Sequence, residues 1–128
     1  MDSRVRALYK IEPQPEAPAQ ARRIIADELA SRLSGPALDD VKLMVSELVT
    51  NGIVHGSTEP DAPVMLDLLV NGEIRCRVSD HGRGFADTPR SQGETGGWGL
   101  HLVEQLSDRW GMRCSPQQTE VWFERHCS

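Results

Sequence analysis

Residues 39–56 are the stretch that most constrains the fold, because apolar residues recur at helical spacing around most of its circumference. A helix of this kind is buried on most sides, so we expect the rest of the chain to pack around it. Asp39 and Asp40 lie in the predicted first turn, where carboxylates suit the positive end of the helix dipole, and Gly56 is a plausible end. The apolar residues are Val41, Leu43, Met44, Val45, Leu48, Val49, Ile53 and Val54.

Two polar residues, Glu47 and Asn51, interrupt this apolar stretch. They are four residues apart and therefore lie on one face of the helix, one turn from each other. An unpaired carboxylate or amide in an apolar environment costs several kcal/mol. We therefore expect both side chains to contact other protein groups, such as an arginine of a neighbouring element, or a ligand.

The composition indicates a single domain, residues 1–128, that is long enough to bury a core without disulfides or metal ions. The net charge of −5 and the lack of a Lys or Arg cluster argue against a nucleic-acid partner. Cys76, Cys114 and Cys127 are far apart and odd in number, which is typical of free thiols in a reducing cytoplasm. No stretch resembles a signal peptide or reaches the length of a membrane span, so we expect no membrane association.

The other hydrophobic patterns predict a mixture of helices and strands. The strongest short signal is Asn71-Gly72, which joins two runs of alternating apolar and polar residues and predicts a hairpin. Strands with one apolar face need a covering layer, so we predict an α/β two-layer sandwich: a mixed, mostly antiparallel sheet with helices on one face. The expected helices are 16–33 and 99–108, and the expected strands are 5–11, 64–70, 73–79, 110–114 and 120–126.

Glycine-rich segments lie beside the ends of two predicted elements, one after a strand and one before a helix. Asp80 comes directly after a predicted strand, and glycines follow it two and four residues later. By itself this spacing also suits a tight turn. Residues 86–97 are polar and lack periodicity, as functional lids and disordered loops do. The GGWG run at 96–99 is no dinucleotide fingerprint, because Leu102 occupies the third glycine position. The sequence also lacks a P-loop and the protein-kinase catalytic loop.

In combination, these motifs resemble the GHKL superfamily of ATP-binding domains. The resemblance lies in Glu-x-x-x-Asn within a helix, Asp-x-Gly-x-Gly after a strand and Gly-x-Gly-Leu opening a helix, in that order. The runs SELVTN at 46–51, GWGLHLV at 97–103 and LSDRWG at 106–111 are similar to bacterial anti-sigma-factor serine/threonine kinases. The resemblance covers about residues 16–125 and implies a Bergerat-type ATP-binding fold.

The resemblance implies a role for each polar residue. Asp80 would accept a hydrogen bond from the exocyclic amine of adenine, where guanine presents a carbonyl oxygen instead. Asn51 would offer its amide oxygen to Mg²⁺. Glu47, one turn away, would act as the general base toward the attacking hydroxyl. Residues 86–95 would form a flap over the nucleotide.

The resemblance also implies that backbone N–H groups at 96–99 close on the triphosphate at a helix N-terminus. His55 would either contact the nucleotide or pack under the following loop. The remaining residues implied to bind the nucleotide are Gly82, Gly84, Phe85, Gly96, Gly97, Trp98, Gly99 and Leu100.

One position departs from the family pattern. Members often have a Gly-x-Thr-Val strand whose threonine supports the adenine site, whereas here Glu120 precedes Val121 and Thr119 comes one place early. Either the register of this strand shifts or the contact is lost.

The function that the resemblance implies is an anti-sigma factor that uses ATP and Mg²⁺ to phosphorylate a serine or threonine of an anti-sigma-factor antagonist. Its partners would be that antagonist and a sigma factor, and it would be a cytoplasmic homodimer. The alternative is a nucleotide-gated binding module with little or no phosphoryl transfer.

Overall fold

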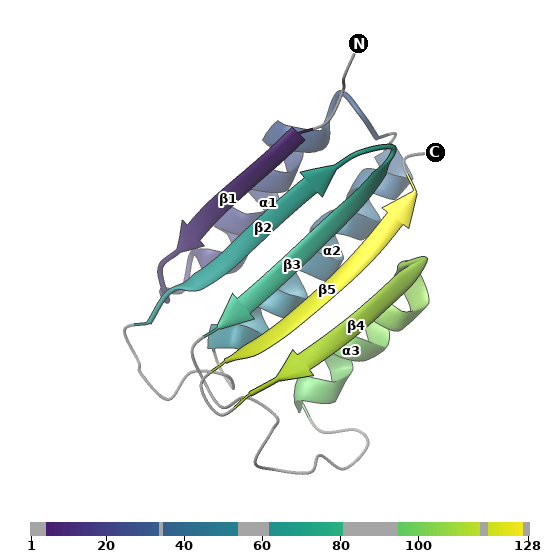
Figure 1. The fold of residues 1–128 in the computed structure, drawn as a ribbon. Helices are drawn as coiled ribbons and strands as arrows, with labels where there is room; N and C mark the ends of the chain where they lie inside the picture. The colour runs from purple at the N-terminus through teal and green to yellow at the C-terminus, as the bar shows by residue number, and fades with distance from the viewer. Residues whose placement is uncertain (1–4, 34, 54–61, 81–94, 116–117, 127–128) are drawn as a thin grey trace.

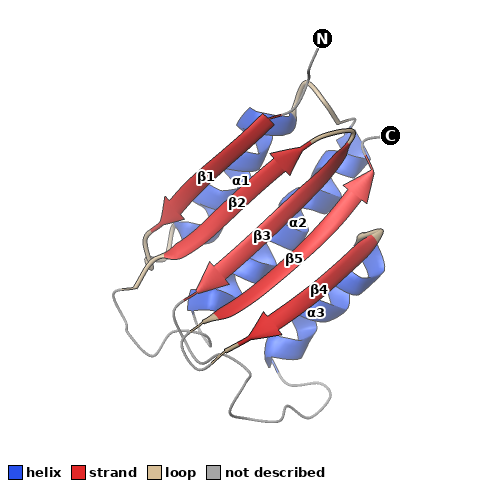
Figure 2. Cartoon of the chain, viewed as in Figure 1, coloured by secondary structure: helices blue, strands red, loops and turns tan. Residues whose placement is uncertain are grey.

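The computed structural model describes residues 5–33, 35–53, 62–80, 95–115 and 118–126. They form a five-stranded sheet of order β1-β2-β3-β5-β4, with the three helices on one face and the other face uncovered by helices (Figures 1 and 2). The elements are β1 (Val5–Ile11), α1 (Ala17–Leu29), α2 (Gly35–Asn51), β2 (Val64–Val70), β3 (Glu73–Asp80), α3 (Thr95–Leu106), β4 (Arg109–Cys114) and β5 (Thr119–His126).

The two-layer sandwich predicted from the sequence is confirmed, with one refinement of the sheet. All four strand pairings within the described ranges are antiparallel, so the sheet is not mixed there. The β2–β3 hairpin turns at Asn71 and Gly72 as predicted, and Gly72 has φ +77°, a conformation that glycine adopts without strain.

The core lies between the sheet and the helices. Alternate residues of β2 and β3 are buried on the helix side, as their hydrophobic pattern predicts. Helix α1 contributes a buried stripe at four-residue spacing, and α2 is buried over most of its length. The fully buried side chains include Ile25, Leu29, Val41, Met44, Val45, Leu66, Leu68, Ile74 and Phe123.

Several element boundaries differ from the sequence predictions. Helix α1 ends at Leu29, four residues early, and α2 begins at Gly35. Asp39 and Asp40 are therefore not in the first turn of α2, and the prediction that they serve its dipole there is wrong. Asp40 instead accepts a hydrogen bond from Arg125 of β5 at 3.2 Å, which ties the central helix to the sheet. The predicted end at Gly56 lies outside the described residues.

Candidate functional site

The C-terminal end of α2 meets the end of strand β3. A Cβ atom built on Gly52 would lie 3.5 Å from Oδ2 of Asp80 and 3.3 Å from Cγ2 of Val64. A side chain here would be in ordinary contact with the carboxylate and slightly tight against Val64, so the end of α2 packs closely on the end of β3. Asn51 directly precedes Gly52. The motifs that contain Asn51 and Asp80 therefore come together here, although these two residues are 29 positions apart in the chain.

Asp80 and Thr119 are direct partners across the β3–β5 ladder. Both side chains are buried, with 7% and 3% of their surface exposed. Within the described part of the chain, the Oγ1 atom of Thr119 has no hydrogen-bond partner. A buried hydroxyl without a partner is unfavourable, and a ligand placed beside Asp80 can satisfy it.

This pairing shows where the displaced threonine lies. β5 begins at Thr119, so the threonine that comes one place early still lies opposite the carboxylate. Glu120 is on the other face of the sheet, where it binds Arg77 at 2.9 Å. The residues present therefore fit an adenine ring, which offers an amine donor to a carboxylate and ring nitrogens to a hydroxyl.

Glu47 and Asn51 are both half-buried on α2. The neighbouring hydroxyls are used within the helix: Ser46 donates to the carbonyl of Leu43 at 3.0 Å, and Thr50 donates to the carbonyl of Ser46 at 2.8 Å. Glu47 and Asn51 thus place a carboxylate and an amide one turn apart on this face of α2.

The donor set fits a magnesium ion held jointly with a nucleotide. No group of three or more His, Cys, Asp or Glu residues within the described ranges could hold a metal ion alone. Mg²⁺ commonly takes one or two protein oxygens and completes its shell with phosphate oxygens and water, and the amide oxygen of Asn51 suits that arrangement.

The glycine-rich run at 96–99 belongs to the start of α3, which begins at Thr95. The prediction that residues 95–97 form part of a loop is therefore wrong. The first N–H groups of a helix lack intrahelical partners, so this position still suits an anion. Leu100, in the next turn, is half-buried and packs against the core.

Other predicted site residues cannot be compared with the structure. His55, Gly82, Gly84 and Phe85 lie outside the described residues, as does most of the expected flap. Of Gly96, Gly97, Trp98 and Gly99, the structure describes the helical backbone only.

The position of Gly52 beside Asp80 was not predicted from the sequence, because a glycine within a helix indicates by itself only a loss of helix stability. The signal that could have found it is the position of a glycine directly after Asn51, because a missing side chain beside a functional residue often marks a close backbone approach. Its neighbour Asp80 is known only once the fold is known.

These features define an antiparallel α/β sandwich with a buried carboxylate at a strand end, facing the end of its central helix. Residues 11–125 match the model of the histidine kinase-like ATPase domain. The chain belongs to this family. Among the described residues, no helix is long and apolar enough to cross a membrane.

Relatives with curated names support this assignment. The chain is 32% identical over 82 residues to an anti-sigma F factor of Clostridium botulinum, covering 56% of this chain and 57% of the relative. It is 34% identical over 103 residues to the serine-protein kinase RsbW of Listeria monocytogenes, covering 67% of this chain and 66% of the relative. The match thus spans less than two thirds of the length of either relative.

A solved structure is similar over nearly the whole chain. It contains the RsbU and RsbW domains of Rv1364c from Mycobacterium tuberculosis and superposes with a TM-score of 0.77, covering 95% of this chain and 32% of that one. At 18% identity this likeness shows the fold, which is the GHKL type that the motifs predict.

Proposed function

We propose that the protein binds Mg·ATP and transfers a phosphoryl group to a serine or threonine of a partner protein, an anti-sigma-factor antagonist, and that it also binds a sigma factor. The observation that carries the proposal is the buried pair of Asp80 and Thr119 beside Gly52, next to the helix face of Glu47 and Asn51. The names of the two relatives, an anti-sigma factor and a serine-protein kinase, support the same function.

The base-binding step follows from the pairing of Asp80 with Thr119. The carboxylate accepts the hydrogen bond of the adenine amine, and the threonine hydroxyl donates to a ring nitrogen. Burial strengthens both hydrogen bonds because the local dielectric constant is low. Guanine would present a carbonyl oxygen to the carboxylate and would be rejected.

The transfer step uses the exposed side of α2. Glu47 accepts the proton of the partner's hydroxyl, whose oxygen attacks the γ-phosphorus while the bond to the bridging oxygen of ADP breaks. Asn51 would hold Mg²⁺, which neutralises charge on the phosphate oxygens when bound. Backbone N–H groups at the start of α3 would contact the same oxygens.

A transfer assay separates this kinase from a nucleotide-gated binding module. The native protein is isolated with its partner and incubated with radiolabelled ATP, beside Glu47→Ala, Asn51→Ala and the control Asp39→Ala. Asp39 is an exposed carboxylate two turns earlier on the same helix. We expect Glu47→Ala to keep ATP binding and to lower transfer by about 10²–10⁴, the usual general-base contribution.

Asn51→Ala should lose the Mg²⁺-dependent part of the ATP affinity, and Asp39→Ala should behave as wild type. Tight ATP binding by the wild type without label on any partner would contradict the kinase. From the resemblance we also propose that residues 1–128 form one domain and that the protein is a cytoplasmic homodimer. Sedimentation of the native protein tests the homodimer.

A further inference from the structure

The face of the sheet away from the helices is basic, although the whole chain is acidic. Residues that alternate with the buried ones line up in rows across all five strands. The chain as a whole has 14 basic and 19 acidic residues, whereas basic residues outnumber acidic ones among the described residues of this face. The basic residues are Arg6, Lys10, Arg75, Arg77, Arg109 and Arg113, and the acidic ones are Asp67, Glu73, Glu120 and Glu124.

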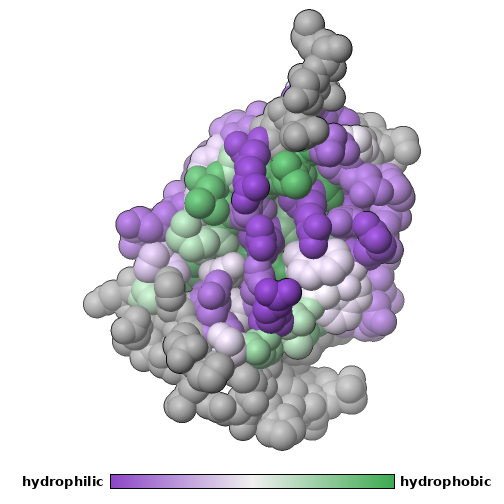
Figure 3. Space-filling view, in the orientation of Figure 1, coloured by the Kyte–Doolittle hydropathy of each residue, from purple (hydrophilic) through white to green (hydrophobic). Residues whose placement is uncertain are grey.

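Figure 3 views this face and shows hydrophilic side chains in rows, with hydrophobic groups between and beside them. A hollow of about 160 Å³ lies in one row, where Arg6 and Arg75 flank Leu69 from the two neighbouring strands. Two strand spacings separate the flanking residues, about 10 Å. Leu69 contributes an apolar side chain to the lining, and Arg6 and Arg75 line the hollow from the neighbouring strands.

Positive charge is in excess at this hollow. Three arginines line it, and Asp67 is its only acidic lining residue among those described. One oxygen of Asp67 accepts hydrogen bonds from both Arg6, at 3.3 Å, and Arg77, at 2.9 Å. Arg75 stacks over the Trp122 ring at 4.5 Å and lies 3.5 Å from Glu124. A guanidinium has five donors, so Arg6 and Arg75 retain capacity for an anion.

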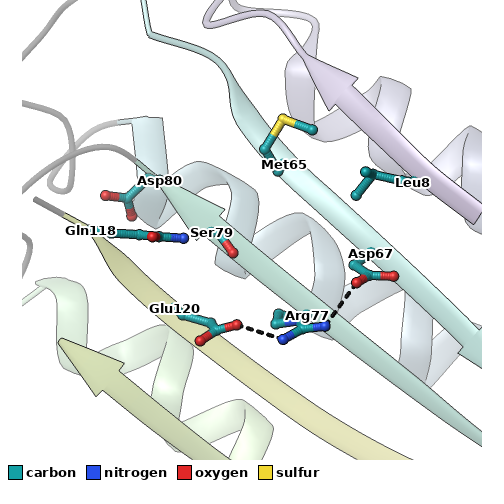
Figure 4. A pocket seen from close by; sticks show the side chains of 8 residues that line it. All are labelled: Leu8, Met65, Asp67, Arg77, Ser79, Asp80, Gln118 and Glu120. Atoms are coloured by element: carbon teal, nitrogen blue, oxygen red, sulfur yellow. Dashed lines mark hydrogen bonds and ion pairs between the residues drawn. The ribbon is translucent and has the colours of Figure 1, made fainter. Parts of the chain in front are cut away.

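The hollow continues along β2 into a second one of about 290 Å³. Asp67 and Arg77 line both, and Arg77 is held between Asp67 and Glu120 (Figure 4). On the far side lie Met65 and Leu8, which is 64% exposed and is the most exposed large hydrophobic residue in the described part of the chain. We call the two joined hollows the β2 trough.

We propose that the β2 trough binds an extended segment of a protein partner, with an acidic side chain between Arg6 and Arg75 and an apolar side chain on Leu8 and Met65. From Leu69 to Met65 is about 14 Å along the strand, which is also the spacing of residues i and i+4 in an extended segment. Such side chains point to the same side, so one segment fills both hollows.

Charge complementarity selects this occupant. A carboxylate matches the excess of guanidinium groups, and a side chain with an aliphatic stem also packs on Leu69. The trough lies on the opposite face of the sheet from Glu47, and its far end is bordered by Asp80. The inference therefore goes beyond the proposed function.

The test is a titration of the isotope-labelled native protein, followed by amide chemical shifts, with the capped peptide TETTTLT. Its Glu and Leu are four residues apart, and TKTTTLT reverses the charge. We expect saturable shifts at 65–69 and 75–77 with the acidic peptide and none with the basic one. Arg6→Glu should weaken binding at least about tenfold, a change of about 1.4 kcal/mol.

Lys10→Glu is the matched control. It makes the same charge change on the same strand and face, and Lys10 lines neither hollow. Binding within about twofold of wild type is expected, and circular dichroism establishes that both variants are folded. The proposal is overturned if shifts do not saturate by about 1 mM peptide or if Lys10→Glu weakens binding as much as Arg6→Glu.

Two further outcomes would assign the face to another occupant and also overturn the proposal. Self-association of the native protein that Arg6→Glu abolishes would identify a second copy of this chain on the trough. A short DNA duplex that competes with the peptide, and whose binding Arg6→Glu weakens equally, would identify a nucleic acid as the occupant of the trough.

Discussion

Thr119 lies directly opposite Asp80 across the β3–β5 ladder, where both side chains are buried and the threonine hydroxyl has no partner among the described residues. The backbone of Gly52 approaches the same carboxylate from the end of α2. The buried Thr119 hydroxyl is unfavourable without a ligand, because buried polar groups need partners. This relationship gives the first two predictions.

Asp80→Asn should weaken ATP binding by about 1.5–3 kcal/mol, the range for hydrogen bonds to charged groups, or roughly ten- to a hundredfold. The amide replaces an acceptor oxygen by a donor that faces the adenine amine. Calorimetry with ATP and GTP measures the effect, with Asp39→Asn on the exposed side of α2 as control. Equal affinity of the wild type for ATP and GTP would contradict the role of Asp80.

Thr119→Val should weaken ATP binding by about 0.5–1.5 kcal/mol, roughly two- to tenfold, through loss of one neutral hydrogen bond. Without nucleotide, the free energy of unfolding should stay the same or rise, because the hydroxyl that is removed has no partner in the described structure. Urea unfolding and calorimetry measure the two quantities. A variant that is less stable but binds ATP normally would argue for a structural role of the hydroxyl.

Gly111→Ala should destabilise the protein by about 1–3 kcal/mol, because the added methyl group has no room. A Cβ atom on Gly111 would lie 2.7 Å from Nε1 of Trp122, whose ring covers this position and also stacks with Arg75. A double-mutant cycle with Trp122→Ala isolates the clash. In the Trp122→Ala background, Gly111→Ala should have little effect on urea unfolding, and an undiminished loss there would refute the explanation.

Stability should fall as the pH rises above the ordinary pKa of cysteine, about 8.5. Burial raises the pKa of the Cys76 thiol, and Asp67 adds a smaller electrostatic contribution in the same direction. Its stabilising contribution is therefore fully present below the unfolded-state pKa and is lost at higher pH, where the unfolded chain releases the proton first. The slope approaches about 1.4 kcal/mol per pH unit.

Urea unfolding of the wild type and Cys76→Ala between about pH 8 and pH 10 measures this slope. The variant is expected to be less stable at every pH, because it leaves a cavity. Its free energy of unfolding should depend less steeply on pH, by the contribution of about one proton. Identical slopes for the two proteins would show that the thiol of Cys76 does not titrate as its burial requires.

Local patterns in the sequence determined most of the elements. The β2–β3 hairpin was predictable because Asn71-Gly72 joins two runs of alternating residues, and the burial of α2 was predictable because its apolar residues cover most of the helix. Element boundaries were less certain, since Asp39 and Asp40 suited a first turn as well as the inner turn that they occupy. The candidate roles of Glu47, Asn51 and Asp80 came from the resemblance of their motifs to the GHKL superfamily.

Only the tertiary structure decided which of these residues meet. β5 pairs with β3 and not only with its sequence neighbour β4, and this long-range choice brings Thr119 opposite Asp80. The closeness of Gly52 to Asp80 and the alignment of Arg6, Leu69 and Arg75 depend in the same way on the tertiary packing. Sequence periodicity indicates which face of an element is buried, but the partner across a ladder is selected by the packing of the whole sheet.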